Sequence, residues 1–91
     1  MSVGDFDNPK GYQQLTSLSS STALTVPDGT GLVMIQAESQ SIRWRDDGTA
    51  PTASVGMVIA VGDVLFYTGK SKTIRLIETT ASAKANVSYY G

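Results

Sequence analysis

The chain has 91 residues, no cysteine and no histidine, and a formal net charge of −1 from seven basic and eight acidic side chains. This composition predicts one small domain without disulfides, and it excludes sites that depend on an imidazole base or an imidazole metal ligand. It also argues against nucleic acid as a partner, because the sequence has no basic run or stripe. A chain of this length hides only about 60–65% of the surface that its unfolded form exposes, so assembly into a larger body is a common way to stabilise it.

Residues 1–11 are expected to form an extended N-terminal arm, because glycine, asparagine and proline interrupt a segment with two isolated apolar residues, Val3 and Phe6. Two interpretations stay open: a tail that is disordered in the free protein, or an arm that orders when it docks on a neighbouring subunit. On the second, Val3, Phe6 and Pro9 are candidate partner contacts. The arm lacks the pattern of a signal peptide, and no window of the chain is apolar enough to suggest a membrane partner.

From residue 12 onward, short segments that favour strands alternate with turns at the spacing typical of a sandwich or barrel. The segment 27–31, with proline, aspartate and two glycines, is the strongest turn signal. No segment has a long apolar stripe at helical spacing. The sequence therefore predicts a single all-β domain over residues 12–91, a jelly-roll-like or Greek-key-like sandwich or barrel of about eight short antiparallel strands. The expected strands are Tyr12–Leu18, Ala23–Val26, Leu32–Glu38, Ser41–Arg45, Met57–Val61, Val64–Thr68, Thr73–Thr79 and Ala85–Tyr90.

The fourth of these strands contains the only tryptophan, Trp44. Ile42 and Trp44 alternate with two arginines, so Trp44 should point into the core while Arg43 and Arg45 point outward. A tryptophan between arginines could instead stack on a base or a sugar ring. The arginines are expected to pair with nearby carboxylates, and a contact with a partner protein is the competing interpretation. The nearby carboxylates are Glu38, Asp46 and Asp47.

The last strand alternates in the same way. Ala85, Val87 and Tyr89 share one face, and the residues between them share the other with Tyr90. One interpretation is that one tyrosine of the terminal pair packs inward. The other is that the pair serves an interface, because tyrosine is large, rigid and amphipathic, and Tyr90 is therefore a candidate partner contact.

No motif in the sequence is arranged like a catalytic or metal site. Asp46 and Asp47 are followed by a glycine and are expected to form a turn, because adjacent side chains in an extended strand diverge and a calcium loop needs alternating oxygen ligands. The glycines of segment 27–31 are not followed by the lysine and helix of a phosphate-binding loop. We therefore expect that the chain has no catalytic residue, metal or cofactor and that it is not an enzyme.

The stretch 35–52, IQAESQSIRWRDDGTAPT, resembles small virion-associated proteins of tailed bacteriophages and prophages. Segments 11–18, 55–57, 62–67 and 83–90 fit the same pattern, which consists of strands and turns and includes no catalytic signature. The resemblance implies a structural part of the particle, first of all a capsid decoration or cement protein that binds and bridges subunits of the major capsid protein. A head–tail neck or tail-associated component is the alternative.

The same resemblance implies a protein that is made in the host cytoplasm and located in the virion, with other virion proteins as partners. A homo-oligomer suits repeated docking on a lattice, and a trimer is the first guess. A different class of function remains open: a carbohydrate-binding sandwich for attachment to a host surface. Such a module would expose Trp44, Tyr67 or Tyr90 along a shallow groove.

Overall fold

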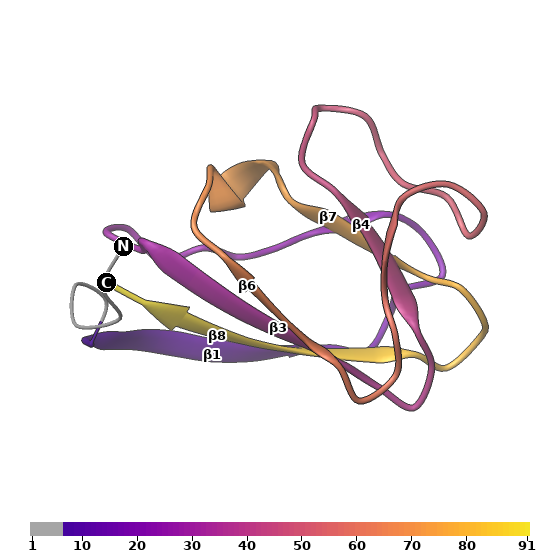
Figure 1. Ribbon diagram of the computed structural model, residues 1–91, viewed down its shortest axis with the longest axis horizontal. Coiled ribbons are helices and arrows are strands. Elements are labelled where there is room, and N and C mark those ends of the chain that lie inside the picture. Colours follow the sequence, from indigo (N-terminus) through magenta and orange to yellow (C-terminus); the bar gives the residue numbers. More distant parts are fainter. Residues whose placement is uncertain (1–6) are drawn as a thin grey trace.

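Two four-stranded antiparallel sheets pack face to face in residues 7–91, which are the residues that the computed structural model describes (Figure 1). Sheet A contains β1 (Pro9–Leu15), β8 (Lys84–Tyr90), β3 (Leu32–Glu38) and β6 (Val64–Tyr67), in that spatial order. Sheet B contains β2 (Thr22–Ala23), β7 (Arg75–Glu78), β4 (Ile42–Arg45) and β5 (Met57–Ile59), also in that order. The all-β sandwich with eight short antiparallel strands confirms the predicted fold class.

The strand bounds differ from the predicted ones at several strands: β2, β5 and β7 are shorter than predicted, and β1 begins and ends three residues earlier. β3 has the predicted bounds, but β1 begins at Pro9, so residues 9–11 belong to the sheet and not to an arm. The cause is a distant partner: Pro9 lies opposite Tyr90, and backbone hydrogen bonds between Asn8 and Gly91 continue the pairing. Residues Ser71–Thr73, expected to be part turn and part strand, form a short 3₁₀ helix instead.

The core lies between the two sheets and is built mainly from inward-facing residues of β3, β4, β5, β7 and β8, together with buried residues of the connecting segments. In β8, the inward residues are Ala85, Val87 and Tyr89, as the alternation predicted. This pattern fixes the register, because a shift by one residue would expose the apolar set of a whole strand. The buried core residues are Leu18, Leu24, Val33, Ile35, Ala37, Ile42, Ile59, Ile74, Leu76, Ala83, Ala85, Val87 and Tyr89.

Trp44 packs against this core from β4 of sheet B, which confirms its inward orientation. Its indole meets the ring of Tyr67, on β6 of sheet A, edge to face, with ring centroids 5.8 Å apart and an interplanar angle of 76°. Such pairs stabilise by about 0.5–1.5 kcal/mol beyond the area that they bury. The pair therefore joins the two sheets near their β5 and β6 edges.

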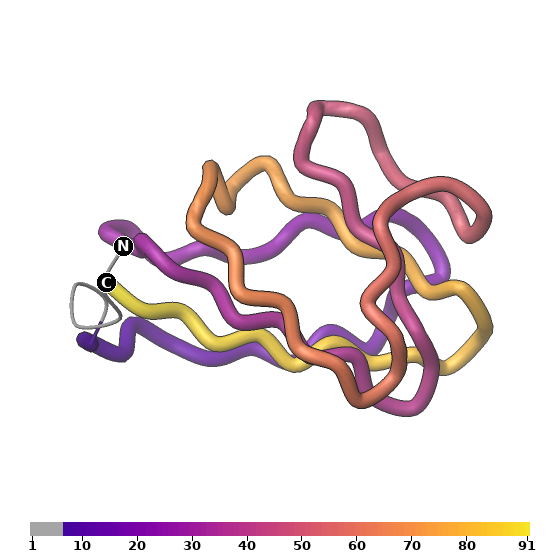
Figure 2. The backbone as a smooth tube through the Cα atoms, in the orientation of Figure 1, coloured from indigo at the N-terminus to yellow at the C-terminus, as the bar shows by residue number. Residues whose placement is uncertain are grey.

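The chain crosses between sheets at a corner that places β5 and β6 on the same side of the sandwich (Figure 2). After β5, residues 60–63 pass to sheet A, where Gly62 N–H donates to the Ala37 carbonyl and Ala37 N–H donates to the Asp63 carbonyl. The other outer strands, β1 and β2, lie on the opposite side. There Thr25 N–H, just after β2, donates to Oε1 of Gln13 on β1 at 3.0 Å.

Candidate docking surface

Exposed apolar side chains are concentrated on the side of the sandwich formed by β5 and β6. Of the seven large apolar residues that are exposed among residues 7–91, six lie between positions 55 and 66. Segment 53–68 contains a single charged residue, Asp63. We call these six residues the β5–β6 surface: Val55, Met57, Val58, Val61, Val64 and Phe66.

The alternation of β6 explains why two of these side chains are exposed. In β6, Leu65 and Tyr67 pack on the core, so Val64 and Phe66 point to the outer face of sheet A. Phe66 lies opposite Met34 of β3 and is 64% exposed. The core does not need these outward side chains, and a cluster of apolar residues on a small protein commonly marks an interaction site.

The backbone of β5 and β6 adds a second property to the surface. Each strand has a neighbour on one side only within the described sandwich, so its other edge presents unpaired N–H and C=O groups. Natural proteins commonly protect such edges with lysine, proline or a bulge. Val64–Tyr67 contains neither lysine nor proline, and its pairing with β3 is regular. The edge is therefore open to pairing with a strand of another chain.

Arg43 holds the loop that leads into β5. Its Nε donates to the Ala53 carbonyl at 3.0 Å and its Nη1 donates to the Gly56 carbonyl at 2.7 Å. A Cβ at Gly56 would stand 3.1 Å from Cβ of Arg43 and 3.2 Å from Cβ of Pro51, so only glycine fits this close approach. The expected pairing of Arg43 with a carboxylate is wrong, because the loop brings two backbone carbonyls within reach first.

Arg45 does pair with a carboxylate, as expected. Its Nε and Nη2 donate to the two oxygens of Asp47, at 3.0 and 2.5 Å. This fork lowers the pKa of Asp47 and raises the pKa of Arg45, with the hydrogen bonds as the main cause. Asp46 accepts instead from the Tyr67 hydroxyl, whose pKa is raised first by burial and then by this carboxylate. The two aspartates thus serve different partners, and the chain bends at 47–49 as the turn signal predicted.

The predicted partner contacts fall into two separate groups. Pro9 and Tyr90 lie opposite each other in sheet A, with Pro9 exposed and Tyr90 half-buried. Arg43 and Arg45 lie on the outer face of sheet B, in the other layer. The remaining two candidates, Val3 and Phe6, lie outside the described residues.

The β5–β6 surface was not predicted from the sequence, although a signal was present. All four residues of Val64–Tyr67 are apolar, so both faces of the strand carry apolar side chains. A strand of this kind is usually central and buried on both faces. Only the strand order places it at an edge, where one of its faces remains uncovered.

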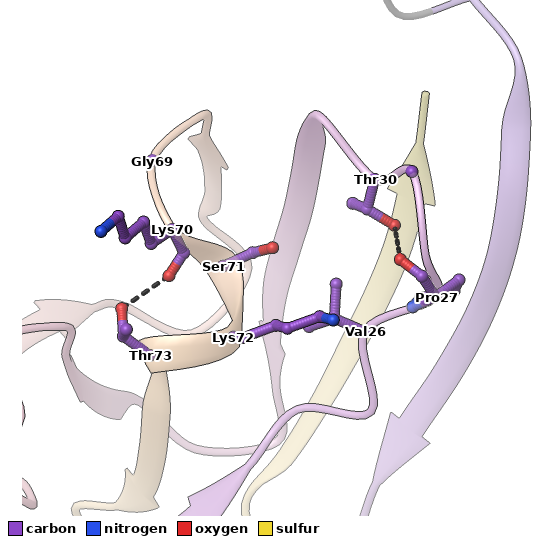
Figure 3. Close-up of a pocket in the computed structure, with 9 residues that line it drawn as sticks. Val26, Pro27, Thr30, Gly69, Lys70, Ser71, Lys72 and Thr73 are labelled. Atoms are coloured by element: carbon purple, nitrogen blue, oxygen red, sulfur yellow. Dashed lines mark hydrogen bonds between the residues drawn. The ribbon is translucent and has the colours of Figure 1, made fainter.

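Two shallow clefts lie on the described part of the sandwich. The larger, of about 300 Å³, lies between the 27–30 turn and the 3₁₀ helix (Figure 3). The hydroxyls of Thr30 and Thr73 donate to the carbonyls of Pro27 and Lys70, at 2.7 and 2.6 Å, so each closes a turn. No carboxylate lines this cleft. The other cleft, of about 270 Å³, lies between Arg45–Asp47 and Val55–Met57, beside the β5–β6 surface.

The part of the chain that the structure describes shows neither a metal-binding group nor a membrane-spanning helix. Residues 7–91 contain no group of three or more Asp, Glu, His or Cys side chains that could hold a metal ion. Within the same residues, no helix has the length and apolar character needed to cross a bilayer. Comparisons with protein-family models, with curated proteins and with solved structures give no match.

Proposed function

We propose that this chain is a non-enzymatic structural protein of a tailed-phage particle, where it acts as a capsid decoration protein. The observation that carries the proposal is the β5–β6 surface, where exposed apolar side chains coincide with two open strand edges. These properties suit a protein that works by binding other proteins. The resemblance of segment 35–52 to virion-associated proteins supplies the setting.

The mechanism is additive. A specific interface covers about 1,200–2,000 Å² in total, which is within reach of a domain that measures 35 × 25 × 20 Å. Each copy bridges neighbouring shell subunits with modest affinity. Repetition over a symmetric shell then multiplies this affinity, because each further contact forms at a high effective concentration.

A neck or tail position uses the same properties of the chain, and the number of copies separates the alternatives. Quantitative mass spectrometry of purified particles should find this chain in a ratio comparable to that of the major capsid protein. A ratio of a few per cent would support the neck or tail position instead. Absence of the chain from washed particles would overturn the structural proposal.

Carbohydrate binding has less support from the arrangement of the aromatic residues. Trp44 and Tyr67 pack against each other and against the core, so their rings are largely used inside the sandwich. Tyr90 lies in β8, at the middle of sheet A, away from this pair in the strand order. These three side chains therefore offer no shared groove for a sugar.

A further inference from the structure

We propose that the β5–β6 surface of one copy is covered by the β1–β2 side of the next copy, so that copies join head to tail. This inference rests on the proposed assembly function, for which it names a second copy of this chain as the partner at that surface. In the joined form, β6 pairs with β1 of the neighbour, and β5 faces the neighbour's β2. Both sheets then continue from one copy into the next, and the outer faces of the sheets remain available for the capsid.

The strand directions make this arrangement possible in both layers at once. Each sheet has four strands, and all neighbours are antiparallel, so the first and last strands of a sheet run in opposite directions. A second copy in the same orientation therefore places its β1 antiparallel to β6. The same holds for β2 and β5 in sheet B, where the three pairings are also antiparallel. Antiparallel strands can pair along their open edges without a crossover connection. Pro9, Lys10 and the register shift before Gly11 protect the start of β1, so the pairing uses the regular stretch Tyr12–Leu15.

One row of side chains across sheet A shows what the junction would contain. Tyr12 lies opposite Ser88, Ser88 opposite Met34, and Met34 opposite Phe66, so the row runs from edge to edge of the outer face. Its two ends are aromatic residues, 63% exposed at Tyr12 and 64% exposed at Phe66. When a second copy continues the row, its Tyr12 stands beside Phe66, at the distance of a cross-strand pair, about 4.5–5.5 Å between Cβ atoms.

This contact brings together the two sides that carry the exposed large apolar residues of the described part of the chain. Six form the β5–β6 surface, and the seventh, Tyr12, lies on the strand that the proposal brings against it. A contact between two β5–β6 surfaces would leave Tyr12 without an apolar neighbour. In the head-to-tail contact, Tyr12 and Phe66 pack side by side on the outer face of the continued sheet.

Charge does not oppose the joining. Segment 53–68 has Asp63 as its single charged residue, and segment 8–26, which contains β1 and β2, has Lys10 as its single charged residue. In the register that sets Tyr12 beside Phe66, these two residues stand at opposite ends of the junction, so no like charges face each other across it.

The size of the domain sets an upper bound on the contact. A side bounded by the 35 Å and 20 Å extents of the molecule covers at most about 700 Å², below the about 800 Å² per partner of a standard specific interface. Each copy uses both sides, so a closed ring doubles the area covered per copy. A contact of this heterologous kind closes into a ring when the rotation between copies allows it.

Cysteine cross-linking tests the proposal cleanly, because the natural chain has no cysteine. Within one copy, positions 12 and 66 are three strand intervals apart, about 14 Å, which is too far for a disulfide. In the joined form the same two positions are neighbours in different copies. Mild oxidation of the Tyr12→Cys/Phe66→Cys double variant should therefore give a ladder or ring of linked copies on a non-reducing gel, at least about tenfold more than either single variant.

Two further samples control the experiment. An equal mixture of Tyr12→Cys and Phe66→Cys should stop at a dimer that contains one of each, because each copy has a single thiol. A Tyr12→Cys/Thr80→Cys variant moves one thiol to an exposed turn outside the contact and should remain unlinked. Circular dichroism checks that all variants are folded.

Two outcomes would overturn the inference. If Phe66→Cys alone links as well as the double variant, β6 pairs with itself. If the double variant links no better than the control with position 80, the two sides do not meet. If particles still contain the chain, either result overturns the head-to-tail contact and leaves the proposed virion function standing. If the double variant gives a linked ladder but particles lack the chain, the contact stands and the virion function is overturned.

Discussion

At the scale of single residues, Tyr89 places a phenol hydroxyl inside the sandwich, where it needs a partner. The residue is 1% exposed, and its hydroxyl donates to Oε1 of Gln13. The same oxygen accepts from Thr25 N–H, so one amide joins β8, β1 and the segment after β2. A buried polar atom with a partner costs little, whereas the same atom without one costs about 1–3 kcal/mol.

Because the hydroxyl of Tyr89 is buried, we expect the protein to lose stability at high pH. Burial raises the pKa of its hydroxyl to about 12, from about 10 in the unfolded chain. Because the folded protein holds this proton more tightly, the contribution is complete below pH 10 and is lost as pH rises from 10 to 12. It amounts to at most about 2.7 kcal/mol. Urea unfolding at pH 8–12 should show this loss, and the Tyr89→Phe variant should lose less. Equal losses in both proteins would contradict the assignment.

The backbone conformation of Ser39 leads us to expect that glycine at this position stabilises the protein. Its φ is 72°, and the Gln40 N–H donates to the Glu38 carbonyl at 2.9 Å, which is the tight turn of three residues that connects β3 to β4. Side chains other than glycine are strained there. Ser39→Gly should raise the free energy of unfolding by about 1 kcal/mol, and Ser39→Val should lower it. Chemical unfolding measures both, and a loss of stability in Ser39→Gly would contradict the account.

At the scale of elements, Arg43 connects β4 to the loop before β5 by two charge-assisted hydrogen bonds. Arg43→Ala should lower the free energy of unfolding by about 1.5–3 kcal/mol and speed amide exchange in loop 46–56. Arg75→Ala is the matched control, because Arg75 is exposed on the neighbouring strand β7. It should change stability by no more than about 0.5 kcal/mol. Equal effects of the two substitutions would show that the loop does not depend on Arg43.

Local patterns predicted most elements because the signals for them are local. The alternation around Ile42 and Trp44 gave the face of β4, and the apolar run over Leu32–Glu38 gave a strand with the observed bounds. The start of β1 at Pro9 was not predictable in this way, because its cause is the pairing with Tyr90 at the other end of the chain.

The partner of Arg43 and the exposure of Phe66 could not be predicted either, because both depend on parts of the chain that are distant in sequence. The loop carbonyls that Arg43 binds belong to residues 10 and 13 positions further along the chain, and no sequence pattern marks a carbonyl as a partner. The exposure of Phe66 depends on the order of strands in sheet A. The sequence therefore allowed us to predict which face of a strand points inward, but not which strands lie at the edge of a sheet. The candidate surface was missed because it depends on the position of β6 at an edge.

At the scale of the whole molecule, the two edges with open strands lie on opposite sides, so one contact can repeat. The wild-type chain is expected to associate, with a mass in sedimentation equilibrium that rises with concentration above the 9.6 kDa of one copy. Met57→Lys/Phe66→Lys places two positive charges on the apolar side and should hold the mass at one copy. Its stability should change little, because both side chains are more than 60% exposed.

Thr80→Lys and Tyr12→Lys complete this comparison, the first as a control outside the contact and the second as a test of its β1 side. Thr80 lies in an exposed turn, so its substitution should leave association unchanged. Tyr12 lies on the opposite side from Phe66, so a self-pairing β5–β6 surface would ignore its loss. A head-to-tail contact would not, because every junction needs one Tyr12 and one Phe66. Association that survives Tyr12→Lys and fails in the Met57→Lys/Phe66→Lys variant would therefore establish self-pairing, whereas failure in both would establish that each copy contributes two different sides.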